Sequence, residues 1–283
     1  MPDETSHEAP RRNAPRLTRK GRIALIVAGV LAAATAAVVL PLTLPGDHGG
    51  RPDTVTIPEG RRSGQVYAAI DKALELPAGT TEKAVPKADL KLPGDAHGNP
   101  EGYLFPATYP VDDKSTPQSL LSYMVNTATQ KFGGGRPAAG ADRAAVNSYQ
   151  TVTIASIVQA EADNGEDMGK VARVIYNRIE QGMPLQMDST INYALDRSTL
   201  DTSSQDTKLD NPYNTYARKG LPPSPIGNPG DAAMRAAVEP ARGDWLYFVT
   251  VKPGDTRFTA DYAEHRRNVA EFNKIQEEGK QGG

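Results

Sequence analysis

The sequence predicts an α+β protein in which a helix-rich middle part is bracketed by strands, with one transmembrane helix ahead of it. Three observations lead to this prediction. Apolar residues recur at helical spacing through the middle of the chain. Strand-like stretches lie on either side of that part, at the start of 54–76 and in 245–251. An uncharged apolar stretch, from Ile23 to Leu44, precedes them all.

The composition excludes several classes of protein. With 283 residues, of which 38% are hydrophobic, the chain can form one sizeable domain or two small ones. It has no cysteine, so disulfides, thiol catalysis and zinc-thiolate sites are excluded. Its four histidines are not at metal-ligand spacing, and no metal or other cofactor is expected. A formal net charge of −2 argues against a nucleic-acid partner.

The N-terminal segment predicts a membrane anchor. Residues 1–22 form a basic tail, and 23–44 has the length that a bilayer requires of a helix, about 20 residues. The basic flank predicts a cytoplasmic N-terminus and a single-pass protein of the cell membrane, with its main domain outside the cytoplasm. A cleaved signal peptide is the alternative, because small residues at 32–37 resemble a cleavage site. Either way, the chain after about residue 46 acts outside the cytoplasm.

The predicted elements follow one another in a simple order. A strand, a turn at Pro58–Gly60 and an amphipathic helix occupy 54–76, and 77–100 is loop-like because it is rich in Pro, Gly and Lys. Later elements are helices over 119–132, Arg143–Asn164 and 166–182, a strand over 245–251 and a final helix over 260–278. We interpret Asn164 and Gly165 as the C-terminal cap of the helix that they end.

One residue interrupts the apolar face of the helix predicted over Arg143–Asn164. In TIASIVQAEADNG (153–165), apolar residues fall at i, i+3 and i+4 from Ile154, and Glu161 takes the i+7 position. Burial on that face would raise the pKa of the carboxyl group, and a carboxyl that is partly protonated near neutral pH is what a general acid needs. The competing interpretation is an ion pair with Arg173 or Arg178 of the next helix.

A second candidate group lies in GMPLQMDSTINYAL (182–195). If this segment is extended, its period of two places Gln186, Asp188 and Thr190 on one face. A row of amide, carboxylate and hydroxyl groups suits a sugar, which offers hydroxyl and acetamido groups. A polar strand face exposed to solvent is the alternative interpretation.

Two further segments carry candidate binding residues. NPYNTYARKGLPPSPIGNPG (211–230) cannot be regular, and long irregular segments inside a domain are often functional. Its candidate sugar-contacting side chains are Asn211, Tyr213, Asn214 and Tyr216. PEGYLFPATYP (100–110) places Glu101 ahead of an aromatic cluster, as a candidate second carboxylate. Both segments can also be structural, the first as a packed loop and the second as packed aromatic residues.

Taken in order, these segments resemble the MltG (YceG-like) family of endolytic murein transglycosylases. The motifs that carry the resemblance are EGYLFPATY, ASIVQAEA, KVARVIYNRIEQGMPLQMDSTINYAL, PYNTYARKGLPPSPIGNPG, YFV and FTADYAEH. They span about residues 100 to 273 and occur in the family's order, which makes the resemblance specific. It implies a catalytic domain over 99–275. VTIPEG and the helix after it look like the family's small LysM-like module, here 54–98 and short for the family.

The resemblance implies an enzyme that cuts peptidoglycan glycan strands internally, at the outer face of the cell membrane and beside peptidoglycan synthases. The family's catalytic glutamate falls on Glu161, which is therefore expected to be the single acid/base. It would cleave the bond from N-acetylmuramic acid (MurNAc) to N-acetylglucosamine (GlcNAc) and form a 1,6-anhydro end. The chain departs from the family at Gln159, where the motif has its first acid, and at Thr256, where the family tends to have a histidine.

Two other functions stay open from the sequence. A peptidoglycan-binding scaffold of the cell envelope would use the same cleft without efficient cleavage, and the short module and Gln159 favour it. A water-using glycoside hydrolase would combine Glu161 as the acid with Asp188 or Glu101 as the base. An inverting hydrolase holds its two carboxyl groups about 6.5–9.5 Å apart to accommodate the water.

Overall fold

The computed structural model describes residues 53–133, 146–197 and 203–281. The predicted basic tail and transmembrane segment lie outside these ranges. Within them, no helix is long and apolar enough to cross a membrane. The described residues fall into two units, of which the first comprises the described part of His48–Phe272. All predicted site residues belong to the first unit.

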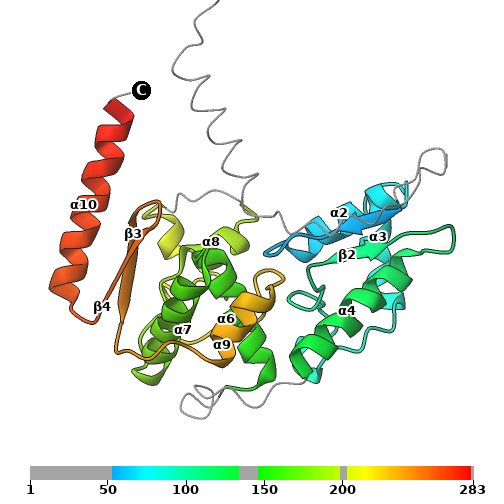
Figure 1. Cartoon of the computed structure of the whole chain (residues 1–283), viewed down its shortest axis with the longest axis horizontal. Helices are drawn as coiled ribbons and strands as arrows, with labels where there is room; N and C mark the ends of the chain where they lie inside the picture. Colours follow the sequence, from blue (N-terminus) through cyan, green and yellow to red (C-terminus); the bar gives the residue numbers. More distant parts are fainter. Residues whose placement is uncertain (1–52, 134–145, 198–202, 282–283) are drawn as a thin grey trace, which may run out of the picture. The chain divides into compact units, whose positions relative to one another are not determined.

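The described residues are mainly helical, with short antiparallel strands (Figure 1). The strands are β1 (Thr54–Thr56), β2 (Thr108–Pro110), β3 (Tyr247–Lys252) and β4 (Asp255–Thr259). The α-helices are α2 (Ser63–Ala73), α3 (Thr80–Ala84), α4 (Pro117–Gly133), α6 (Ser148–Glu161), α7 (Gly165–Glu180), α8 (Asp188–Ala194), α9 (Asp231–Val238) and α10 (Tyr262–Gln281). Short 3-10 helices are η1 (Val85–Lys87), η2 (Gly94–Ala96) and η3 (Asp206–Lys208). The predicted α+β class is confirmed.

Each strand pairs with one other strand in the described part of the chain. β1 pairs with β2 and β3 pairs with β4, and both pairs are antiparallel. Val55 lies opposite Tyr109 in the first pair, and both side chains are buried. Phe248 lies opposite Phe258 in the second, with stacked rings whose centroids are 5.7 Å apart. Cross-strand apolar pairs of this kind set the register of a two-stranded sheet.

The elements before residue 134 bury the apolar positions that the sequence predicted. Ile70 of α2 and Leu121 and Met124 of α4 are fully buried in the core. Each such side chain contributes about 1.5–3 kcal/mol relative to an exposed position. The turn at 58–61 joins this part to the segment 226–230, since Gly60 N donates to Asn228 O (2.8 Å) and Asn228 N donates to Arg61 O (2.9 Å). Residues 54–98 therefore belong to the same compact unit as the rest of the core.

Helices α6, α7 and α9 pack against one another and lie side by side in Figure 1. Every side chain of α6 from Thr151 to Val158 is buried, so this helix lies inside the fold and not on its surface. Tyr176 of α7 is fully buried as well, and its hydroxyl donates to Ala237 O of α9 (2.8 Å). This packing fixes the C-terminal end of α6, where Glu161 lies.

The predicted boundary between α6 and α7 is wrong in one respect. Asn164 does not cap the end of α6, because the helix stops at Glu161 and Ala162 is extended. Asn164 instead caps the start of α7, since its side-chain oxygen accepts a hydrogen bond from Asp167 N (2.9 Å). An asparagine oxygen satisfies one of the unpaired N–H groups at a helix start, and Glu166 and Asp167 there suit the helix dipole. The predicted start at Arg143 lies outside the described residues, and the described helix begins at Ser148.

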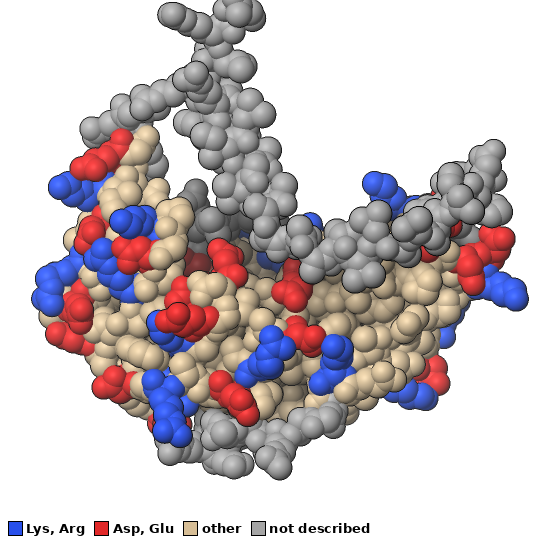
Figure 2. Space-filling view, in the orientation of Figure 1, with Lys and Arg blue, Asp and Glu red and all other residues tan. Residues whose placement is uncertain are grey.

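Charged side chains of both signs are interspersed on the face shown in Figure 2, with no broad area of one sign. This distribution agrees with the near-neutral formal charge of −2.

Candidate active site

Glu161 is the last residue of α6, and the two ends of that helix determine its position. The helix begins with a capping box, in which the Asn147 side chain accepts from Gln150 N (2.9 Å) and the Gln150 side chain accepts from Asn147 N (2.8 Å). It ends because Ala162 turns to an extended conformation, with φ −144° and ψ 140°. The carbonyl groups at a helix C-terminus carry partial negative charge, which disfavours an anionic carboxylate beside them.

The Glu161 residue is half-buried, and the pKa of its carboxyl group is raised. The main cause is burial, because the charged form loses its hydration there. Two hydrogen bonds from Ser189 oppose the rise: Ser189 Oγ donates to Glu161 Oε1 (2.6 Å), and Ser189 N donates to the same oxygen (3.3 Å). The negative charge of Asp188 raises the pKa further. The result is an oriented carboxyl group that keeps its proton to a higher pH than a free glutamic acid.

The alternative in which an arginine neutralises Glu161 is wrong. Arg178 is buried, and its guanidinium group donates to Leu246 O (2.6 Å) and Leu185 O (2.8 Å). Arg173 donates from Nε to Ala241 O (2.7 Å). Neither arginine forms an ion pair with Glu161, so the carboxyl group is available for chemistry.

The irregular segment 211–230 holds the start of α8 beside Glu161. Thr215 makes three of the contacts: its carbonyl accepts from Gln186 N (3.0 Å), and its hydroxyl accepts from Met187 N (3.0 Å). The same hydroxyl shares a hydrogen bond with Thr190 Oγ1 (2.9 Å). The segment that the sequence marked as irregular therefore positions the residues around the candidate acid.

Asp188 and Tyr216 lie next to Glu161. Tyr216 OH donates to Asp188 Oδ1 (2.6 Å), and the charges of Asp188 and Glu161 both act on the tyrosine. Burial, followed by the hydrogen bond to Asp188, raises the pKa of Tyr216, so its hydroxyl remains a donor at neutral pH. The structure thus brings together Glu161, Ser189, Asp188 and Tyr216.

The extended conformation predicted for 182–195 is wrong from Asp188 onward. Asp188 begins α8, where its charge suits the helix start, and Thr190 Oγ1 donates back to Met187 O (2.7 Å). Gln186 is exposed, whereas Thr190 is fully buried, so these side chains do not share one face. Gln186 has a left-handed backbone (φ 52°), and its Oε1 accepts from Arg178 Nη1 (3.1 Å).

The other residues predicted in the irregular segment also make contacts within the fold. Asn214 is fully buried; its Nδ2 donates to Leu209 O (2.7 Å) and its Oδ1 accepts from Tyr216 N (3.0 Å). Asn211 Oδ1 accepts from Tyr213 N (2.9 Å), and the Tyr213 hydroxyl shares a hydrogen bond with Ser224 Oγ (2.6 Å). These bonds shape the loop, and direct contact of these side chains with a sugar stays a prediction.

Glu101 forms no hydrogen bond with this group and is only 4% exposed. Its Oε1 accepts from Ser63 N (3.0 Å) and from Asn228 Nδ2 (3.3 Å), while its Oε2 accepts from Tyr193 OH (3.1 Å). Burial raises the pKa of Glu101, although the bonds from Ser63 and Tyr193 and the charge of Arg62 lower it. The carboxylate connects the start of α2 with Asn228 and with Tyr193 of α8, which is a positioning arrangement.

Ser189 is the site residue that sequence reasoning missed. The period-two pattern placed it on the face opposite Asp188 and Thr190, because it assumed a strand. In a helix that begins at Asp188, Ser189 lies in the first turn and faces the end of α6. The signal that could have indicated this helix is the order of Asp188, Ser189 and Thr190 ahead of an apolar run, which is typical of a helix start.

The two departures from the family pattern have structural positions. Gln159 accepts from Gly230 N (3.0 Å) through its Oε1, at the start of α9. Thr256 of β4 shares an exposed hydrogen bond with Thr250 of β3 (3.1 Å). Neither residue forms a hydrogen bond with Glu161 or Ser189.

Together, the fold and the site define a class: an α+β domain that presents a desolvated, hydrogen-bonded glutamic acid at the end of a buried helix, as acid/base enzymes do. The chain belongs to the YceG-like family, whose sequence model matches residues 32–271.

Two relatives carry the name endolytic murein transglycosylase. The protein of Bacillus subtilis (strain 168) is 36% identical over 168 residues, which are 59% of this chain and 46% of the relative. The protein of Streptococcus pneumoniae (strain D39) is 35% identical over 177 residues, 60% of this chain and 32% of the relative. This chain thus spans half or less of the length of these relatives.

A solved structure shows the same fold. A crystal structure of a yceG-like protein from Listeria monocytogenes matches with a TM-score of 0.65 and 28% identity, over 76% of this chain and 75% of that one.

Proposed function

We propose that this chain is a lytic transglycosylase of peptidoglycan, with Glu161 as its single acid/base residue. The observation that carries the proposal is the state of that carboxyl group: it is desolvated, it has no arginine partner, and Ser189 orients it. Membership of the YceG-like family and the names of the two relatives support the choice of substrate.

The proposed reaction has two proton transfers and consumes no water. Protonated Glu161 donates its proton to the glycosidic oxygen, and the bond from MurNAc C1 to that oxygen breaks. The Glu161 carboxylate then accepts the proton of the MurNAc 6-hydroxyl, and O6 forms a bond to C1. This closes a 1,6-anhydro ring and restores the acid. Because the nucleophile belongs to the same sugar, proximity replaces the second carboxylate that a hydrolase needs.

Asp188 favours one alternative, a hydrolase in which this residue activates water. Its charge lies close enough to Glu161 to raise the pKa of that carboxyl, and Tyr216 OH holds its Oδ1 (2.6 Å). Glu101 is unsuited to the same role, since it is 4% exposed and both of its oxygens accept hydrogen bonds. In the transglycosylase, Asp188 instead supports the protonated state of Glu161.

The test is mass spectrometry of glycan strands after incubation with the full chain in detergent. We expect internal cuts that end in 1,6-anhydro-MurNAc, reduced by about 10²–10⁴-fold in Glu161→Gln. Glu166→Gln is the matched control, because it removes an exposed carboxylate from the start of the neighbouring helix α7.

Other products would lead to other functions. Reducing ends in place of anhydro ends would support the hydrolase, and their loss in Asp188→Asn would identify the base. Binding of glycan without any cleavage, unchanged in Glu161→Gln, would support the scaffold.

We propose further that residues 23–44 anchor the chain in the cell membrane, with the catalytic domain outside the cytoplasm and peptidoglycan synthases as neighbours. The uncharged stretch and its basic flank support this arrangement. Alkaline extraction of membranes tests it: the full chain is expected to stay in the membrane fraction, and a chain without residues 23–44 is expected to be released. Release of both would contradict the anchor.

A further inference from the structure

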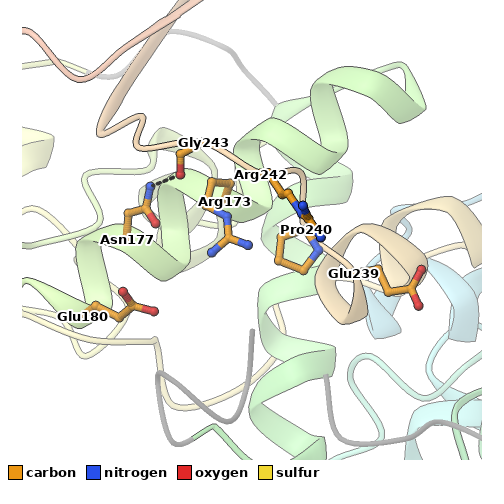
Figure 3. A pocket seen from close by; sticks show the side chains of 7 residues that line it. All are labelled: Arg173, Asn177, Glu180, Glu239, Pro240, Arg242 and Gly243. Carbon is orange, nitrogen blue, oxygen red and sulfur yellow. Dashed lines mark hydrogen bonds between the residues drawn. The ribbon is translucent and has the colours of Figure 1, made fainter. Parts of the chain in front are cut away.

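A cavity separate from the Glu161 site lies between α7 and the segment that follows α9. Its volume is about 570 Å³, and it is lined by Arg173, Asn177, Glu180, Glu239, Pro240, Arg242 and Gly243 (Figure 3). Cavities that bind small ligands have volumes of about 300–1,000 Å³. None of the predicted site residues lines it, and the proposed chemistry makes no use of it.

Hydrogen bonds fasten the wall of this cavity to α7. Gly169 O accepts from Ala241 N (3.0 Å), and Arg173 Nε donates to Ala241 O (2.7 Å). One turn further, Asn177 Nδ2 donates to Trp245 O (2.9 Å) and Gly243 O (3.3 Å). Contacts at every fourth residue of one helix face hold residues 241–245 against α7. These bonds fix one wall of the cavity, which opens to solvent at Glu180 and Arg242, since both residues are exposed.

Charged groups of both signs line the cavity without forming ion pairs. The Nε of Arg173 is used by Ala241 O, and no carboxylate of the described residues pairs with the guanidinium groups of Arg173 or Arg242. Figure 3 shows the Arg173 guanidinium and the Glu180 carboxylate pointing toward the same open space, whereas the Glu239 carboxylate points away from it. A ligand with a carboxylate at one end and an amine at the other would complement these groups.

We propose that this cavity binds a short peptide through its carboxylate and its amine, and that the peptide is a stem peptide of the glycan strand. Guanidinium groups bind carboxylates through paired hydrogen bonds, and Glu180 would bind the ammonium group. The choice of stem peptide rests on the proposed function, since such peptides combine free carboxylates with a side-chain amine. The cavity would then hold the strand while its glycan occupies the Glu161 site.

The test is calorimetric titration of the full chain carrying Glu161→Gln, so that no cleavage occurs. The probe is the pentapeptide L-Ala-γ-D-Glu-L-Lys-D-Ala-D-Ala with its N-terminus acetylated, as in the amide link to the sugar. We expect binding that weakens at least about tenfold in Arg242→Ala and in Glu180→Gln, a loss of about 1.4 kcal/mol or more. Arg235→Ala, which removes an exposed arginine of α9 outside the cavity lining, is expected to bind as the parent does.

Modified probes separate the two charge contacts. Acetylation of the probe's lysine amine should weaken its binding to the parent, but it should not weaken binding to Glu180→Gln any further. Amidation of the probe's C-terminal carboxylate should weaken its binding to the parent, but it should not weaken binding to Arg242→Ala any further. No binding by the parent, or equal binding by all variants, would overturn the proposal. Cleavage of glycan strands stripped of their peptides is measured separately, so failure of the cavity and failure of the catalytic proposal are distinguishable.

Discussion

The contact between Ser189 and Glu161 leads to a quantitative prediction for the variant Ser189→Ala. The serine hydroxyl donates to Glu161 Oε1 over 2.6 Å, and a hydrogen bond to a charged group contributes about 1.5–3 kcal/mol. Since one pKa unit corresponds to about 1.36 kcal/mol, complete loss would raise the pKa of Glu161 by about one to two units. The N–H of residue 189 keeps its own bond to the same oxygen, so we expect a rise of about one unit.

Two measurements check this rise. Carbon-detected NMR titration of the glutamate carboxyl groups follows the pKa of Glu161 directly. The pH profile of kcat/KM on glycan strands follows it through activity, because only the protonated acid donates to the glycosidic oxygen. The alkaline limb of the profile should move upward by about one pH unit, together with the NMR midpoint.

Two control variants make the test specific. Ser203→Ala removes a serine that donates to another half-buried carboxylate, that of Asp206 (2.8 Å), and it should leave the Glu161 titration unchanged. Ser189→Thr keeps the hydroxyl and should restore most of the parent pKa. An unchanged or lowered Glu161 pKa in Ser189→Ala would refute the reasoning.

Three further predictions concern stability. The pKa of Glu161 is raised above the value of 4.5 for a free side chain, so protonated Glu161 stabilises the folded state relative to the unfolded state. This stabilisation is fully present below about pH 4.5 and is lost as the pH rises through the folded-state pKa. The Tm of Glu161→Gln, relative to that of the parent, should therefore rise from pH 4 to pH 7. A relative Tm that falls over this range would contradict the predicted pH dependence. Gly102→Ala should lose about 3 kcal/mol in denaturant unfolding, because φ is +86° and the added Cβ would lie 2.6 Å from the Pro225 ring. Gly64→Ala, in open space on α2, should be neutral or stabilising. Thr190→Val should lose about 1–3 kcal/mol of unfolding free energy with KM unchanged, since its buried hydroxyl bonds Met187 O and Thr215. A higher KM without loss of stability would instead support the predicted substrate-binding role of Thr190.

The helices and the candidate acid could be predicted from local patterns. The apolar positions of α2, α4 and α7 recur at helical spacing, and burial of such a face follows from the hydrophobic effect alone. In α6 the sequence showed one apolar face, whereas the structure buries every side chain from Thr151 to Val158. Glu161 could be singled out in the same way, because a carboxyl group on an apolar stripe departs from the pattern around it. The irregularity of 211–230 follows directly from its Asn, Pro and Gly content.

The partners of these residues depended on the tertiary structure. Nothing within α6 indicates that Glu161 contacts Ser189, 28 residues later. Nothing within α7 indicates that Arg178 donates a hydrogen bond to Leu246 O, 68 residues later. The same holds for Glu101, whose carboxylate accepts hydrogen bonds from Ser63, Asn228 and Tyr193.

Strand β2 also depends on the tertiary structure. Its three residues form their strand pairing with β1, which lies more than fifty positions earlier in the chain. The pattern of a segment records which of its apolar side chains are buried, because the hydrophobic effect acts on an apolar face whatever its partner is. It does not record which groups meet them. The partners of a buried side chain follow from how separate segments pack. These partners decide whether a buried carboxyl group acts as a catalytic acid, forms an ion pair or holds structural elements together.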